Sequence, residues 1–218
     1  MPAYLDHNAT TPVDARVVEG MLPFLQGPYG NPSSLHRHGR RARDAVERAR
    51  MQVAALVGAQ PQQVVWTSGG TEADNLAIKG LCRGAPSGQL LYGATEHPAV
   101  MEAAEALRPL GWAVHALAVD HNGVLDWPAF EARCAQAPVR LVSLMRANNE
   151  TGVVQDTARA AATTHAAGGW LHVDATQAAG KLPLSLDDTG ADLLTLSSHK
   201  LYGPKGIGAL VAVSYTHL

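Results

Sequence analysis

A lysine in a glycine-rich turn is the strongest chemical signal in this sequence. Lys200 comes after Ser198 and His199 and follows the apolar run Leu193 to Leu196, and residues 203–208 hold three glycines and a proline. An amine at a strand end, beside a hydroxyl and an imidazole, can lose its proton through desolvation and become a nucleophile. The alternative is a surface lysine in a flexible loop, which is how we interpret Lys205.

Two glycines before a helical run form a second candidate site. Gly69 and Gly70 follow a predicted strand, and Thr71 comes shortly before the helical run Leu76 to Ile78. Free N–H groups at a helix start and the Thr71 hydroxyl can bind phosphate oxygens. An ordinary N-terminal cap is the alternative, because Thr71 and Asp74 have the spacing of a capping box. The segment is neither GxGxxG nor GxxxxGK[ST], so we expect no dinucleotide loop and no P-loop.

An aspartate at the end of another apolar run is the third candidate. Asp174 follows Trp170 to Val173, and a buried carboxylate needs a cation or several donors to stay ionised. A protonated pyridine nitrogen is one such cation; a helix cap or a salt bridge is the commoner role. Residues 148–152 (Asn-Asn-Glu-Thr-Gly) and 96–98 (Glu-His-Pro) add polar groups after two more predicted strands. Because open α/β sheets bind ligands at strand ends, we expect one shared site.

The apolar runs between these motifs predict the elements that position them. Seven runs suit buried strands: 64–67, 89–92, 114–119, 140–145, 170–173, 193–196 and 207–213. Residues 42–57 carry apolar side chains at spacings of three and four, which predicts an amphipathic helix that Gly58 ends. Helical patterns between several strands predict an α/β fold: a mostly parallel seven-stranded sheet with helices on both faces.

The chain is expected to have three parts. Residues 1–13 are dense in Asn, Thr and Pro and predict an extended arm, and residues 14–213 predict one large domain. Residues 214–218 follow an apolar strand without a turn signal, and we interpret them as a non-native tail.

Composition excludes several classes of protein. The net charge is −2 with 17% charged residues, so a nucleic-acid partner is not expected. Cys82 and Cys134 are the only cysteines and neither belongs to a CxxC pair, which predicts a cytoplasmic protein without disulfides or structural zinc. His36 and His38 alternate in an Arg-rich segment that we interpret as a solvated loop, and no metal site is expected. No apolar run approaches the roughly 18 residues of a membrane span.

Together these motifs resemble cysteine desulfurases, which are pyridoxal-phosphate (PLP) enzymes of fold type I related to class V aminotransferases. The resemblance covers nearly the whole chain, through motifs at residues 4–12, 30–34, 67–72, 75–80, 96–97, 148–152, 172–175 and 198 onward. Residues 203–206 (Gly-Pro-Lys-Gly) look like the branch that serves iron–sulfur cluster assembly and thiolation. Gly70 stands where the family more often has Ala.

The resemblance implies a role for each candidate residue. Lys200 would form the Schiff base with PLP and later act as a base at the substrate α-carbon. Asp174 would keep the pyridinium nitrogen protonated, and His97 would stack on the ring. Gln177 and Asn149 would lie at the phenolate oxygen, with Asn149 also near the substrate carboxylate. The phosphate would be held by Gly70, Thr71, Ser197 and His199.

The resemblance also implies an activity: L-cysteine is converted to L-alanine, and the sulfur passes to an enzyme cysteine as a persulfide. It implies a homodimer with sulfur-acceptor or scaffold proteins as partners. The family continues beyond this length with a small domain and the nucleophilic cysteine, so we expect the chain alone to be inactive. The alternatives are a related PLP lyase or aminotransferase and a non-catalytic scaffold.

Overall fold

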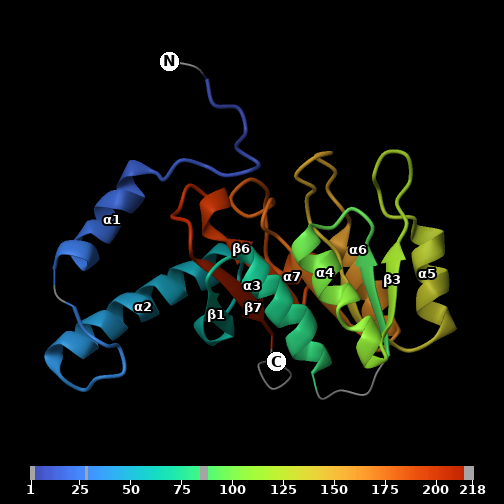
Figure 1. Cartoon of the computed structure of the whole chain (residues 1–218), viewed down its shortest axis with the longest axis horizontal. Coiled ribbons are helices and arrows are strands. Elements are labelled where there is room, and N and C mark those ends of the chain that lie inside the picture. Colours follow the sequence, from blue (N-terminus) through green and yellow to red (C-terminus); the bar gives the residue numbers. More distant parts are fainter. Residues whose placement is uncertain (1–2, 28, 84–87, 214–218) are drawn as a thin grey trace.

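A single seven-stranded sheet organises the described part of the chain. The structure, a computed structural model, describes residues 3–27, 29–83 and 88–213. The strand order is β1-β7-β6-β5-β4-β2-β3 (Figure 1). The strands are β1 Val64–Thr67, β2 Gln89–Gly93, β3 Ala113–Leu117, β4 Val139–Ser143, β5 Trp170–Asp174, β6 Leu193–Ser197 and β7 Gly208–Ala212. The predicted strands are therefore confirmed with small shifts of their ends, and residues 214–218 lie outside the described residues.

The sheet is mostly parallel, as predicted. Only β7 runs against its neighbours β1 and β6, while β2 to β6 pair in parallel. The reversed strand β7 brings Gly208 against Gly69, in the loop between β1 and the helix Gly70–Asn75. A Cβ atom at Gly208 would lie 2.7 Å from the Gly69 carbonyl carbon, so glycine is needed there for close approach.

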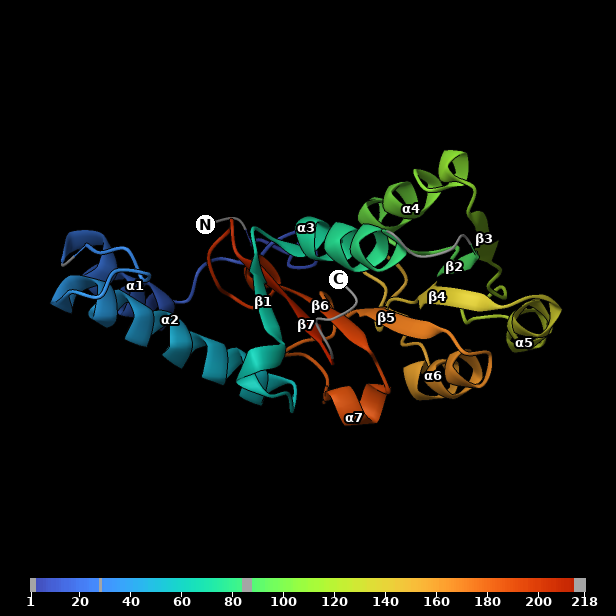
Figure 2. The same cartoon turned by 90° about the horizontal axis from the view of Figure 1, so that it is seen from below.

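Helices cover both faces of the sheet. The helices are α1 Ala15–Gln26, α2 Arg37–Leu56, α3 Gly70–Asn75, α4 Pro98–Glu105, α5 Trp127–Gln136, α6 Thr157–Ala166 and α7 Leu186–Thr189, with short helical turns η1 Pro61–Gln63, η2 Leu76–Gly80, η3 Arg108–Leu110 and η4 Ser198–Lys200. Figure 2 shows α3 and α4 on one face and α5, α6 and α7 on the other. None of the helices in the described ranges is long and apolar enough to cross a membrane.

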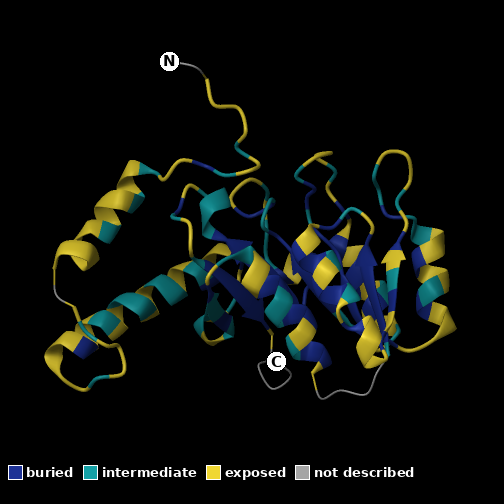
Figure 3. Ribbon diagram, viewed as in Figure 1, coloured by how far each residue is buried: buried dark blue, intermediate teal, exposed yellow. Residues whose placement is uncertain are grey.

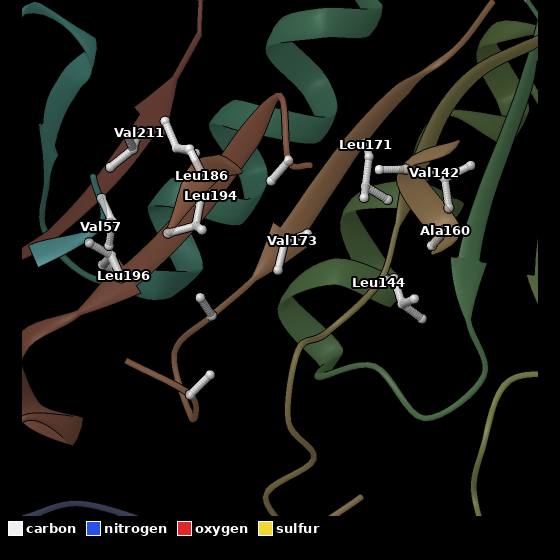
Figure 4. Close-up of a cluster of buried hydrophobic side chains, with 14 of the residues drawn as sticks. Val57, Val142, Leu144, Ala160, Leu171, Val173, Leu186, Leu194, Leu196 and Val211 are labelled. Atoms are coloured by element: carbon white, nitrogen blue, oxygen red, sulfur yellow. The ribbon is translucent and has the colours of Figure 1, made fainter. Parts of the chain in front are cut away.

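The side chains of β5 alternate between an apolar face and a polar face of the sheet. Leu171 and Val173 point into the core under α5 to α7, together with Leu194 and Leu196 of β6 (Figure 4). Full burial of side chains of this size contributes about 1.5–3 kcal/mol each. Successive side chains of a strand point to opposite faces, so the other residues of β5 face α3. The polar site is built on that second face.

The region around α2 differs from the prediction. The helix begins at Arg37, so the loop expected around His36 and His38 is wrong: the His36 Nδ1 caps the helix by accepting from the Gly39 N–H at 3.3 Å. The first turns of α2 are mostly charged and show no apolar periodicity. The helix predicted from apolar spacing therefore began only at residue 42. The end at Leu56, followed by Gly58 with φ of +64°, agrees with the predicted stop. The preceding helix, α1, buries no residue and projects from the sheet (Figure 3).

Candidate active site

A polar cavity of about 600 Å³ lies where β5, β6 and the start of α3 meet the N-terminal segment. In Figure 1 this segment crosses above the strand ends. All nine residues singled out from the sequence line the cavity: Gly70, Thr71, His97, Asn149, Asp174, Gln177, Ser197, His199 and Lys200. The structure thus brings them together, while the roles assigned to them stay predictions.

The amine of Lys200 lies at the end of the short helical turn that follows β6. It donates to the carbonyl oxygens of Asn8 and Ala9, with Nζ–O distances of 2.5 and 2.8 Å. Partial burial lowers the pKa of Lys200, and the nearby Lys181 lowers it further, while Asp174 and Asp6 oppose the shift. A lowered pKa increases the fraction of neutral amine, which is the form that attacks a carbonyl carbon.

Asp174 forms the buried floor of the cavity. It is the last residue of β5, is 5% exposed, and its Oδ1 accepts from the Thr176 N–H at 2.9 Å. Burial raises the pKa of Asp174, whereas the bond from Thr176 and the charges of His97 and Lys200 lower it. The carboxylate therefore caps a turn, not the helix that one alternative proposed, and also presents a negative charge that a ligand cation would stabilise.

The loop before α3 is not the capping box that the Thr71 spacing had offered as an alternative. The helix begins at Gly70, its N-cap is Gly69, and no side chain caps it. Thr71 lies inside the first turn, and the Ser68 N–H instead donates to Glu72 Oε2 at 2.6 Å. That part of the interpretation is wrong because the chain enters the helix two residues earlier than the spacing implied.

Neighbouring strand ends close this part of the cavity. A Cβ at Gly70 would lie 3.2 Å from Thr176 Oγ1 and 3.5 Å from the Ser197 Cβ. Position 70 is therefore crowded, and a larger side chain would push into the groups around it. The hydroxyls of Thr71 and Ser197 and the His199 ring border the same space.

His97, Gln177 and Asn149 come from three separate loops. His97 is the N-cap of α4, and its Nδ1 accepts from the Ala99 N–H at 3.1 Å, which fixes the ring at the cavity edge. Gln177 donates through Nε2 to the Asn8 carbonyl oxygen at 2.8 Å. The Asn149 carbonyl oxygen accepts from Asn8 Nδ2 at 3.0 Å. Asn8 is thus a shared partner of both loops.

The N-terminal segment supplies the contacts that sequence reasoning missed. Thr11 donates through its N–H and its hydroxyl to the His199 carbonyl oxygen, both at 2.9 Å, and its hydroxyl accepts from the Tyr202 N–H at 2.8 Å. The His199 Nδ1 also lies 3.0 Å from the Thr10 hydroxyl. These bonds join residues nearly 190 positions apart, so no local pattern could indicate them. The motif at residues 4–12 was the only signal.

Both cysteines of the sequence lie away from the cavity. Cys82 and Cys134 are buried in helical segments, and burial raises the pKa of their thiols to about 12 and about 11. A thiol reacts as its thiolate, so neither cysteine has the properties of a nucleophile near neutral pH.

The polar groups of the cavity fit PLP. Asp174 is buried and lines the cavity, so it suits a cationic ring nitrogen, and the Lys200 amine borders the same space. The start of α3 at Gly70, which no side chain caps, and the hydroxyls of Thr71 and Ser197 suit a phosphate. An acid, an amine and an anion-binding loop in one cavity match the three polar parts of this cofactor.

Comparisons with known proteins agree with this geometry. The family described as "Aminotransferase class-V" matches residues 3–216. The cysteine desulfurase IscS of Anaeromyxobacter sp. (strain Fw109-5) is 49% identical over 213 residues, which cover 96% of this chain and 52% of the relative. IscS of Salmonella arizonae is also 49% identical, with 96% and 53% covered. The chain therefore spans about half the length of the curated relatives it matches.

A solved structure shows the same fold. The structure described as SspA in complex with cysteine has a TM-score of 0.94 and 35% identity, and the match covers 100% of this chain and 63% of that one. The predicted fold class and the predicted resemblance to cysteine desulfurases are thereby confirmed.

Proposed function

This chain belongs to the class-V aminotransferase family, and on that basis we propose that it forms the PLP-binding part of a cysteine desulfurase. The reaction would convert L-cysteine to L-alanine and transfer the sulfur to a cysteine thiolate as a persulfide. The observation that carries the proposal is the meeting of Lys200 and Asp174 in one cavity with the loop at Gly70 and Thr71. The cysteine-bound relative supports L-cysteine as the substrate.

Each part of the cavity would hold a different part of the cofactor. Lys200 would bind PLP covalently, and Asp174 would keep the ring nitrogen protonated. Gly70, Thr71, Ser197 and His199 would bind the phosphate, His97 would lie on the ring face, and Gln177 and Asn149 would contact the phenolate oxygen. When bound, PLP supplies a ring that accepts electrons from the substrate α-carbon.

Lys200 would also move a proton at the substrate α-carbon. An amine can act as a general base only in its neutral form, and it must lie within hydrogen-bond reach of the proton. Burial lowers the pKa of Lys200 and so favours the neutral amine. The carbonyl oxygens of Asn8 and Ala9 hold Nζ at one end of the cavity, which we propose positions the amine whenever it is not bound to the cofactor.

The remaining features of the proposal come from the family. We propose a cytoplasmic homodimer that passes sulfur to acceptor or scaffold proteins for iron–sulfur cluster assembly or thiolation. Residues 1–13 would belong to the small domain and residues 14–213 to the PLP-binding large domain. Because Cys82 and Cys134 are buried with raised thiol pKa values, the persulfide would form on a cysteine that this sequence does not contain.

The proposal is tested by separating proton transfer from sulfur transfer. The chain is incubated with PLP and L-cysteine in D₂O, and deuterium at the α-carbon is followed by NMR together with alanine, sulfide and keto-acid formation. We expect PLP-dependent α-deuteration that Lys200→Ala abolishes and Lys205→Ala preserves, without multiple turnovers of sulfide release.

Two outcomes would contradict the proposal. Steady formation of a keto acid in place of deuterated cysteine would favour an aminotransferase. An absence of both PLP binding and α-deuteration in a folded chain would favour a non-catalytic scaffold.

A further inference from the structure

A row of buried polar side chains crosses the sheet next to Asp174. Ser143 of β4, His172 of β5 and Thr195 of β6 are fully buried. The His172 Nδ1 lies 2.8 Å from the Ser143 hydroxyl, and its Nε2 lies 2.9 Å from the Thr195 hydroxyl. His172 is two residues before Asp174 on the same strand, so both side chains face α3. The row is therefore part of the packing behind the cavity floor.

Asp74 of α3 covers this row and borders the cavity. Its side chain is buried, and its Oδ1 lies 3.5 Å from the His172 Nε2 without any hydrogen-bond partner in the described part of the chain. The Thr195 hydroxyl acts on the same carboxyl group and by itself lowers the pKa of Asp74, against the larger effect of burial. Asp74 and Asp174 both line the cavity. Two carboxyl groups thus face one buried space.

A third carboxyl group lies in the same region. Glu96 is 4% exposed, its Oε1 accepts from the Met145 N–H at 2.5 Å, and its Oε2 has no partner among the described residues. Carboxylates that share a buried site cannot all ionise, because each charge raises the free energy of the others. This mutual effect favours a proton on one or more of the three.

The surroundings distinguish the three groups. Asp174 receives a hydrogen bond from the Thr176 N–H and the favourable charges of His97 and Lys200. In the described ranges, no lysine or arginine forms an ion pair with Asp74. Burial and the charge of Asp174 raise the pKa of Asp74 well above its usual value, and the same causes act on Glu96. Burial lowers the pKa of His172 to about 3, so this imidazole is neutral and does not stabilise a carboxylate as a cation would.

The charge of Asp74 sets the direction of the hydrogen bonds along the row. A neutral imidazole donates through one nitrogen and accepts through the other. An ionised Asp74 would accept from Thr195, which would accept from Nε2–H of His172. A protonated Asp74 would donate to Thr195, whose hydroxyl would donate to Nε2, leaving the His172 proton on Nδ1 to donate to Ser143. The His172 tautomer therefore reports the state of Asp74.

We propose that Asp74 is a positioning residue that holds a proton at neutral pH and begins a hydrogen-bond chain through Thr195 and His172 to Ser143. A neutral Asp74 leaves Asp174 as the anion at the cavity floor, so that a single carboxylate is available to a cationic ring nitrogen. This consequence rests on the proposed PLP site, whereas the protonation itself does not.

The direct test is the tautomer of His172 in the 218-residue chain without cofactor. Histidine is labelled with ¹³C and ¹⁵N, His172 is assigned through the backbone, and its ring nitrogen shifts are measured at pH 7. We expect the proton on Nδ1. A proton on Nε2 would overturn the proposal, and this experiment needs no variant that might fail to fold.

Infrared difference spectra give a second measurement. Subtracting the Asp74→Asn spectrum from that of the wild type should show a lost C=O stretch of a neutral carboxylic acid. The matched control is Asp187→Asn, at an exposed position of α7, which should lose a carboxylate stretch. Loss of a carboxylate stretch in Asp74→Asn would contradict the proposal.

The cofactor separates this inference from the proposed function. With PLP present, Asp74→Asn should keep the visible absorption maximum of the wild type and Asp174→Asn should shift it. An equal shift in both variants would show that Asp74 carries the charge. If PLP did not bind at Lys200 at all, the proposed function would fail while the tautomer and infrared results would stand.

Discussion

The two ends of the cavity are built in different ways. The Asp174 end is made by side chains of adjacent strands β4 to β6 and by α3, and its polar groups are buried. The Lys200 end is half-buried and is completed by carbonyl oxygens of Asn8 and Ala9, about 190 residues away in the sequence. The fold of the sheet thus fixes the acid, whereas the position of the amine depends on a docked segment.

The protonation of the carboxyl groups at the floor and that of the Lys200 amine are therefore controlled in different ways. At the floor, burial and neighbouring carboxyl groups decide which group ionises. At the Lys200 end, partial burial and then the charge of Lys181 lower the pKa of a partly solvated amine, where screening weakens the effect of each charge. Changes at the floor should therefore have larger consequences than changes around Lys200 other than loss of the lysine itself.

The largest effect is expected from Asp174→Ala. The variant leaves Lys200 and the anion-binding loop in place, so some PLP should remain bound, but the ring nitrogen loses its anionic partner. We expect α-deuteration of L-cysteine to fall by about 100-fold or more, the scale seen when a preorganised electrostatic partner is removed. Asp174→Glu should recover little, because the longer side chain does not fit the buried floor. Near-normal exchange in Asp174→Ala would show that the acid lies elsewhere.

The next largest effect concerns stability in acid, through His172. The pKa of an unfolded histidine is about 6.5, and burial lowers the pKa of His172 to about 3. Between these values the unfolded chain binds a proton that the folded chain does not. His172 therefore costs no stability above pH 6.5, and stability is lost as the pH falls from 6.5 toward 3.

Replacing the titrating group should remove this loss. Between pH 7 and pH 5 the free energy of unfolding of the wild type should fall by about 2 kcal/mol more than that of His172→Gln. Urea unfolding at the two pH values measures the difference. If the free energy of unfolding had the same pH dependence in both proteins, His172 would be protonated in the folded chain at pH 5. That result would contradict a neutral His172 between Ser143 and Thr195.

A smaller effect is expected where the N-terminal segment docks. Thr11→Val keeps the shape of the side chain but removes the hydroxyl that donates to His199 and accepts from Tyr202. We expect a loss of about 1–2 kcal/mol of stability, as for a lost hydrogen bond with a partner left unsatisfied. Thr163→Val, whose hydroxyl bonds within α6, is the control. Hydrogen exchange at the Tyr202 amide should quicken only in Thr11→Val, and unchanged exchange there would argue against docking.

The smallest effect is expected from Lys181→Ala. Burial is the main cause of the lowered Lys200 pKa, and Lys181 adds to it. Removing Lys181 should raise that pKa and slow covalent capture of PLP at pH 7 by a few-fold at most, since less neutral amine is present. Lys79→Ala on the η2 turn is the matched control. Faster capture of PLP by Lys181→Ala would contradict the prediction that Lys181 lowers the pKa of Lys200.

The sequence predicted the strands, and it predicted residues that line one cavity, because both follow local rules. Apolar runs marked each strand, and polar residues directly after them marked the cavity, since parallel strands end at a common edge. The family resemblance then supplied roles that spacing alone left open for Asp174 and Thr71.

What the sequence could not predict depends on distant contacts. The partners of Lys200 are backbone carbonyls of Asn8 and Ala9. Every residue has a backbone carbonyl, so the sequence does not indicate which of them accept a hydrogen bond. Asp74 was interpreted as a helix-start residue, and its unpaired Oδ1 beside His172 emerges only when α3 packs on β5. The start of α2 was missed because charged residues carry no apolar period.

The most direct test of the account is the identity of the lysine that binds PLP. The chain is loaded with PLP, reduced with borohydride and digested, and the modified peptide is sequenced. We predict a pyridoxyl group on Lys200, the amine that shares the cavity with Asp174 and has a lowered pKa. A label on Lys79, Lys181 or Lys205 in place of Lys200 would contradict the account.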